Sequence, residues 1–114
     1  MALPTNKPPV LVVESHVVFR NLLARFLEQE GYSVLVAAGR EEAVPLSRAF
    51  ATQIRLLVVS AGLRDLKLLT DDFAREWPGV SVLILAPFKA DEHRSSALPE
   101  QWKTQLRNAL LDHP

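Results

Sequence analysis

Four short apolar runs, separated by stretches with helical spacing, constrain the fold more than any other feature of this chain. The runs are rich in valine, leucine and isoleucine, and they lie at Val10–Val13, Val34–Ala38, Leu56–Val59 and Val80–Leu85. Apolar runs that hardly alternate with polar residues are typical of strands buried on both faces, as in parallel sheets. Four such strands joined by helices predict an α/β fold, a doubly wound parallel sheet with helices on both faces.

Apolar side chains at helical spacing lie between and after these runs. They are Phe19, Leu22, Leu23, Phe26 and Leu27; then Ala43, Leu46 and Phe50; then Leu66, Leu69, Phe73 and Trp77; and finally Trp102, Leu106, Ala109 and Leu110. We expect Ser15 to cap the first helix and Gly31 to end it. Pro45 predicts a second helix that starts late or kinks, and Pro99 is a suitable residue for the start of the last one.

The amino-acid composition of the chain excludes several classes of function. The 114 residues fit one domain, which we place at residues 9–114 after a disordered lead-in at residues 1–8. Lys+Arg and Asp+Glu both number 13, which argues against a nucleic-acid binder. There is no cysteine and no apolar run long enough to cross a bilayer. We therefore expect a cytoplasmic protein without disulfides, thiolate metal sites or membrane contact.

The carboxyl ends of the predicted strands are where a doubly wound sheet binds its ligands. The residues expected there are Glu14, Ser15, Ser60 and Ala86. A small-ligand domain that uses this crevice is one possible function. However, Glu-Ser-His follows the first strand, where a nucleotide-binding loop would need glycines.

Three segments, Val10–Glu14, Arg20–Tyr32 and Leu35–Ala43, resemble the response-regulator receiver family of bacterial two-component signalling. The resemblance covers about residues 9 to 85 well. It implies a flavodoxin-like fold, with a parallel sheet of strand order 2-1-3-4-5. It also implies that a histidine kinase transfers a phosphoryl group to an aspartate beside a bound Mg²⁺.

The residues that match the family's phosphorylation site depart from its pattern. Glu14 matches the first of two acids, but Ser15 replaces the second, and Ser60 stands where the family has its aspartate nucleophile. Ala86 replaces a hydroxyl residue, and Glu100 matches best the position of a lysine. Mg²⁺ needs several hard oxygen ligands, and a serine hydroxyl is a weak nucleophile without a base. We therefore expect no catalytic residue, no cofactor and no metal, with Glu14 only a weak candidate ligand.

The segment from 86 to 98 is too short for the fourth helix and fifth strand that the family has there. We expect at most a helical turn at Asp91–Ser96, and a fifth strand absent or reduced to Ser96–Leu98, which leaves strand order 2-1-3-4. The fourth strand would then be an open edge that invites a partner strand or needs a covering loop. The predicted interface consists of Val82, Ile84, Phe88, Trp102 and Leu106.

The sequence thus predicts a degenerate receiver, or pseudo-receiver, of a phosphorelay. It would act by phosphorylation-independent protein–protein interaction, with a protein partner or as a homodimer, and not as an enzyme. The alternative is a phosphorylatable receiver that uses a displaced acid, Asp65 or Glu14, although Asp65 also suits the start of the third helix. Ser60 with His16 as its base lacks a nucleophile elbow and a third residue. The three histidines lack metal-ligand spacing.

Overall fold

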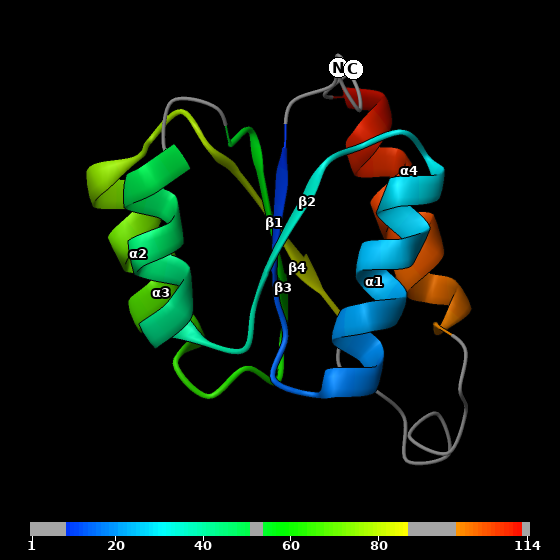
Figure 1. Ribbon diagram of the computed structural model, residues 1–114, viewed down its shortest axis with the longest axis horizontal. Coiled ribbons are helices and arrows are strands. Elements are labelled where there is room, and N and C mark those ends of the chain that lie inside the picture. Colours follow the sequence, from blue (N-terminus) through cyan, green and yellow to red (C-terminus); the bar gives the residue numbers. More distant parts are fainter. Residues whose placement is uncertain (1–8, 51–53, 87–97, 113–114) are drawn as a thin grey trace, which may run out of the picture.

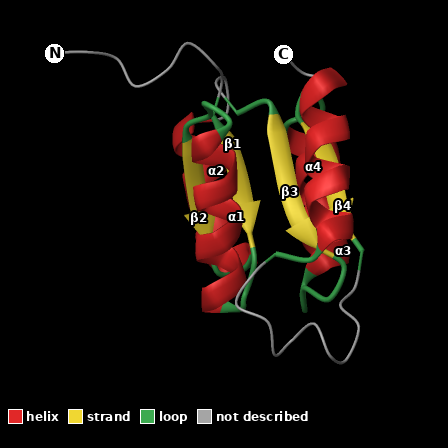
Figure 2. Cartoon of the chain, turned by 90° about the vertical axis from the view of Figure 1, so that its right-hand side faces the viewer, coloured by secondary structure: helices red, strands yellow, loops and turns green. Residues whose placement is uncertain are grey.

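The computed structural model describes residues 9–50, 54–86 and 98–112, and it confirms the predicted α/β fold. Strands and helices alternate as β1 (Val10–Val13), α1 (Val17–Gln29), β2 (Val34–Ala37), α2 (Arg40–Phe50), β3 (Leu56–Ser60), α3 (Leu66–Glu76), β4 (Ser81–Leu85) and α4 (Glu100–Asp112). All strand pairs are parallel, and the strand order is β2-β1-β3-β4 (Figures 1 and 2).

The sheet separates two apolar cores. Figure 1 shows α1 and α4 on one face and α2 and α3 on the other. Even-numbered residues of β1 and β3, such as Val12 and Val58, pack with α1 and α4, whereas odd-numbered ones, such as Leu11 and Leu57, pack with α2 and α3. Every residue of these two central strands is buried. Their apolar runs are unbroken because side chains on both faces lie in a core.

Two local predictions about where helices start are wrong. α1 begins at Val17 with His16 at the N-cap position, so Ser15 does not cap it. α2 does not start late, because it runs from Arg40 through Pro45 to Phe50. A proline at this depth removes one helical hydrogen bond, and burial of Ala43 and Ser47 against the sheet offsets that loss. Gly31, with a φ of 96°, follows α1 as expected.

Several predictions fall on residues outside the described ranges. These are the lead-in at residues 1–8, the helical turn at 91–96, most of the reduced fifth strand and the interface residue Phe88. Among the described residues no fifth strand is present, and β4 is the last strand on its side of the sheet.

α4 covers part of the β4 edge, which corrects two residues of the predicted interface, whereas Val82 and Ile84 of β4 are exposed. Trp102 and Leu106 were expected to contact a partner, but both are fully buried in the core beneath α4. The Trp102 indole Nε1 donates to the Ala86 carbonyl oxygen at 2.7 Å. Gln105 donates to the Ile84 carbonyl oxygen at 3.2 Å and accepts from the Ala86 N–H at 3.1 Å. These side chains satisfy edge groups that a fifth strand would otherwise pair.

The Gln105 contacts give a first prediction. Gln105→Leu keeps the size of the side chain but leaves the Ile84 carbonyl and the Ala86 N–H without these partners. Both groups lie near the surface, so water replaces part of the loss, and we expect the free energy of unfolding to fall by about 1 kcal/mol. Urea unfolding measures this change. The control is Asn108→Leu at an exposed position of the same helix. An equal effect of the two substitutions would contradict the bridging role of Gln105.

Candidate functional site

Parallel pairing brings Glu14, Ser60 and Ala86 to the same end of the sheet, as predicted. Each residue comes at or directly after the last residue of β1, β3 or β4. Val13 is in register with Val59, and Ser60 with Leu85, so the three positions are neighbours across adjacent strands. α4 begins at this end of the sheet as well (Figure 1), and Glu100 is its first residue.

Glu14 is the acid of this cluster, and it is buried. The residue keeps a relative exposure of only 3%. Its Oε2 accepts a hydrogen bond from the His16 N–H at 2.7 Å, which ties the carboxylate to the turn before α1. Its Oε1 has no hydrogen-bond partner among the described residues. An unpaired carboxylate oxygen in a buried position is energetically costly, so this end of the sheet carries an unsatisfied acceptor.

Ser60 and Ala86 supply little chemistry beside Glu14. Ser60 is buried, and no hydrogen bond from the described part of the chain reaches its hydroxyl, so His16 is not placed as its base. The His16 ring instead packs against Phe19, with centroids 4.8 Å apart. Ala86 has no polar side-chain atom, and its backbone is bonded to α4. The arrangement offers one carboxylate and one hydroxyl, and the one guanidinium seen there, that of Arg20, donates to the Glu14 carbonyl oxygen at 3.2 Å.

Glu100, which matches the family's lysine position, carries the opposite charge and is exposed. Its carboxylate pairs with Lys103 at 3.0 Å within the first turns of α4. Asp65, the displaced acid considered above, occupies the N-cap position of α3, as expected, but its side chain makes no capping hydrogen bond. Within the described residues no group of three or more potential metal ligands gathers.

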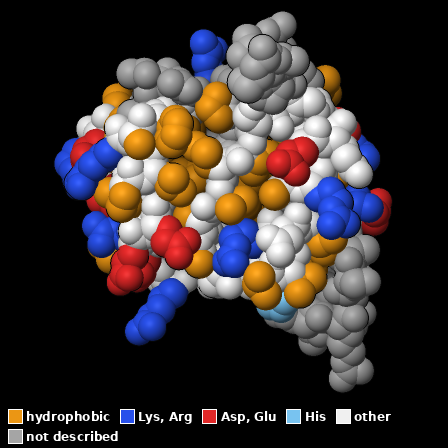
Figure 3. Space-filling view, in the orientation of Figure 1, with side chains coloured by type: hydrophobic (Ala, Val, Ile, Leu, Met, Phe, Trp, Pro, Cys, Tyr) orange, Lys and Arg blue, Asp and Glu red, His pale blue; other side chains and the backbone are white. Residues whose placement is uncertain are grey.

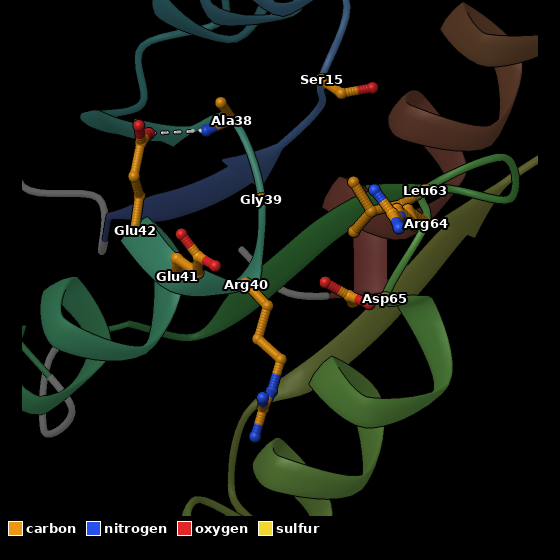
Figure 4. A pocket seen from close by; sticks show the side chains of 9 residues that line it. All are labelled: Ser15, Ala38, Gly39, Arg40, Glu41, Glu42, Leu63, Arg64 and Asp65. Atoms are coloured by element: carbon orange, nitrogen blue, oxygen red, sulfur yellow. Dashed lines mark hydrogen bonds between the residues drawn. The ribbon is translucent and has the colours of Figure 1, made fainter.

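A hollow of about 310 Å³ lies beside these positions, where the loops after β1, β2 and β3 meet (Figure 4). Its lining consists of Ser15, Ala38, Gly39, Arg40, Glu41, Glu42, Leu63, Arg64 and Asp65. The three carboxylates of this set outnumber its two guanidinium groups, and one carboxylate, Glu42, is held by the Ala38 N–H at 2.7 Å. The net negative charge of the lining does not favour a phosphate group.

Arg40, which lines this hollow, also belongs to an ion-pair cluster that the sequence did not indicate. The Arg40 Nε lies 2.6 Å from Asp72 Oδ2, and an Arg75 nitrogen lies 2.9 Å from Asp72 Oδ1. The hydrogen bond from Arg40, and to a smaller extent the one from Arg75, holds the pKa of Asp72 below its usual range, although burial opposes this shift. Arg40 therefore points away from the hollow and joins α2 to α3. The two residues are 32 positions apart, so no local spacing indicated the pair.

Comparisons with solved structures identify the fold. No protein-family model matches the sequence, and a search of curated proteins found no significant match. A response regulator receiver protein from Pseudomonas putida is similar over 84% of this chain and 78% of its own, with 25% identity and a TM-score of 0.61. A response regulator from Thermotoga maritima is similar over 80% and 76%, with 23% identity and a TM-score of 0.62.

The chain therefore has the receiver-domain fold, in the form of a doubly wound parallel sheet with strand order 2-1-3-4 among its described residues. None of the described helices is both long and apolar enough to pass through a membrane.

Proposed function

We propose that this chain is a degenerate receiver domain of a two-component or phosphorelay system, and that it acts by binding protein without being phosphorylated. The composition of the strand ends carries this proposal. Ser60 stands where the resemblance places the phosphoryl acceptor, and Glu14 is buried and bonded to the His16 N–H. Ala86 and Glu100 provide neither a hydroxyl nor a cation for a phosphoryl group. A receiver fold that cannot take up a phosphoryl group can still act by binding another protein through its surface.

The test of this proposal is incubation with acetyl phosphate and Mg²⁺, followed by intact-protein mass spectrometry. We expect the mass to stay unchanged, because no accessible carboxylate stands at the acceptor position and one buried glutamate binds Mg²⁺ poorly. A phosphoryl adduct that hydroxylamine removes would be an acyl phosphate and would contradict the proposal. Asp65→Asn and Glu14→Gln would then show which acid carries the adduct, as the alternative of a displaced acceptor requires.

Amide NMR provides a second readout of the same site. Titration with Mg²⁺ and beryllofluoride, a mimic of the phosphoryl group, is expected to leave the amide signals of Glu14, Ser60 and Ala86 in place. Their displacement at millimolar ligand would show that metal and anion still bind there, which would refute a purely protein-binding domain.

A further inference from the structure

The outer edge of β2 carries backbone groups that have no partner among the described residues. β2 is the last strand on its side of the sheet, and the carbonyls of Ser33 and Ala37 accept hydrogen bonds from the N–H groups of Val10 and Glu14. Backbone groups of successive residues point alternately to the two sides of a strand, so those of Val34 and Val36 point away from β1. Their N–H and C=O groups are therefore available to another strand.

Nothing in β2 itself protects this edge. Folded proteins usually block open edges with proline, charged side chains, bulges or a covering element. The residues of β2 are Val, Leu, Val and Ala, without a charge or a proline. The open stretch is sharply limited, because the next outward N–H, that of Ala38, is bonded to Glu42 Oε1. The opposite edge differs near its carboxyl end, since Gln105 and Trp102 of α4 bond the carbonyl of Ile84 and both backbone groups of Ala86.

The surface around this edge is apolar. On the α1 face of the edge, Val36 keeps 42% of its surface exposed, and on the opposite face Leu46 and Phe50 of α2 are only partly buried against the core. Figure 3 shows this side of the molecule, where hydrophobic side chains gather over α2 and β2 and charged side chains lie around them. An apolar patch rimmed by charge is typical of a protein–protein contact.

We propose that a second copy of this chain pairs with the β2 edge, so that two sheets join into one of eight strands. A two-fold axis perpendicular to the sheet would make the two β2 strands antiparallel, with Leu35 opposite its own copy. Val34 of one chain then lies opposite Val36 of the other, and each such pair exchanges both hydrogen bonds. All the open groups of Val34 and Val36 are satisfied in this arrangement, which is the isologous contact of a closed dimer.

The side of α1 that faces away from α4 lies next to the β2 edge. The buried row of α1 consists of Phe19, Leu23 and Leu27. On the α4 side of this row, Phe26 contacts the Arg107 guanidinium of α4, whose carbon lies 5.4 Å from the ring centroid. The row Arg20, Ala24 and Glu28 has helical spacing of four on the other side of α1, so it lies nearer to β2 and its open edge.

The charges on this row fit an antiparallel copy of α1. The two-fold axis places Ala24 near its own copy, and Arg20 of each chain near Glu28 of the other. Within one chain, Glu28 lies near the carboxyl end of α1, where a negative charge opposes the helix dipole, and the last turn has no basic residue. A guanidinium from the second copy compensates this charge. α2 is complementary to its own copy too, with Glu41 and Glu42 in its first turn and Arg48 in its last.

This inference rests on the proposed protein-binding function, since it names a second copy as the partner. The test compares Val36→Lys with Val82→Lys by sedimentation velocity from micromolar to millimolar concentration. The two valines are exposed to 42% and 40%, and they lie in the two edge strands, so the substitutions are matched. We expect the unaltered chain and Val82→Lys to dimerise equally, and Val36→Lys to dissociate at least about tenfold more readily, because its ammonium enters the apolar contact.

Charge exchange gives a second test, and urea unfolding of each variant checks that the fold is kept, because Arg20 also donates a hydrogen bond to the Glu14 carbonyl oxygen at 3.2 Å. Glu28→Arg should weaken the dimer, and the double substitution Arg20→Glu with Glu28→Arg should restore it. A monomeric unaltered chain at millimolar concentration would overturn the pairing, as would dissociation by Val82→Lys but not by Val36→Lys. The acetyl phosphate experiment tests the proposed function independently of either result. Failure of the β2 pairing can therefore be distinguished from failure of the proposed function.

Discussion

Trp102→Ala is expected to lower the free energy of unfolding by about 3–5 kcal/mol, the range for removing a buried tryptophan side chain. Its ring has no exposed surface, and it meets the Phe19 ring edge-on at a centroid distance of 5.9 Å. The substitution also removes the hydrogen bond from the indole to the Ala86 carbonyl. Because small domains are stable by only about 5–15 kcal/mol, this loss is a large part of the total, and the variant should unfold at a much lower urea concentration.

Two further variants separate the contribution of the indole hydrogen bond from that of apolar burial. Trp102→Phe keeps most of the apolar volume but loses the indole donor, so we expect a loss of about 1–2 kcal/mol. Leu111→Ala changes an apolar residue of the same helix that is 77% exposed, and it should alter stability by less than about 0.5 kcal/mol. Urea unfolding followed by far-ultraviolet circular dichroism compares the variants. If Trp102→Ala were as mild as Leu111→Ala, α4 would not be docked as the structure has it.

The fold was predictable because burial leaves a direct pattern in the sequence. β1 and β3 lie at the centre of the sheet, so both faces of each strand require apolar side chains, and their runs are unbroken. The position of Glu14 beside Ser60 followed from the same reasoning, since parallel strands end at one edge of the sheet.

The interface role of Trp102 was predicted wrongly for an identifiable reason. The absence of a fifth strand was expected to leave the β4 edge open to a partner, whereas α4 packs on the sheet and its side chains bond part of that edge. Trp102, Leu106 and Leu110 recur every four residues and form one buried row. That spacing indicated an apolar face but not its partner, since contacts between distant segments depend on how the elements pack.

The ion pair between Arg40 and Asp72 is the other feature that could not be predicted from the sequence. The substitution Asp72→Asn tests how much this ion pair contributes to the free energy of unfolding. The Asp72 side chain is 7% exposed, whereas those of Arg40 and Arg75 are 40% and 65% exposed. Water therefore hydrates the two guanidinium groups after the substitution and limits the cost. We expect the free energy of unfolding at pH 7 to fall by about 1–2 kcal/mol, less than for a fully buried pair.

The pH dependence of this effect has a definite sign. The hydrogen bond from Arg40, and then that from Arg75, holds the pKa of Asp72 in the folded protein below the value of an unfolded aspartate, about 3.9. The ionised carboxylate therefore stabilises the fold fully above about pH 5, and this contribution declines as the pH falls through the unfolded and then the folded pKa. The difference in stability between the unaltered chain and Asp72→Asn should be largest near pH 7 and should shrink below about pH 4.

Asp71→Asn is the matched control for this prediction. Asp71 is the preceding residue of α3, and it pairs with Lys67 at 3.0 Å, but the two side chains are 54% and 87% exposed. Such a surface pair contributes at most about 0.5 kcal/mol, so its removal should change stability little at any pH. Urea unfolding of the three proteins at pH 7 and pH 3 makes the comparison. A loss at Asp72 that persists unchanged at pH 3 would show that packing of the side chain, and not its charge, joins α2 to α3.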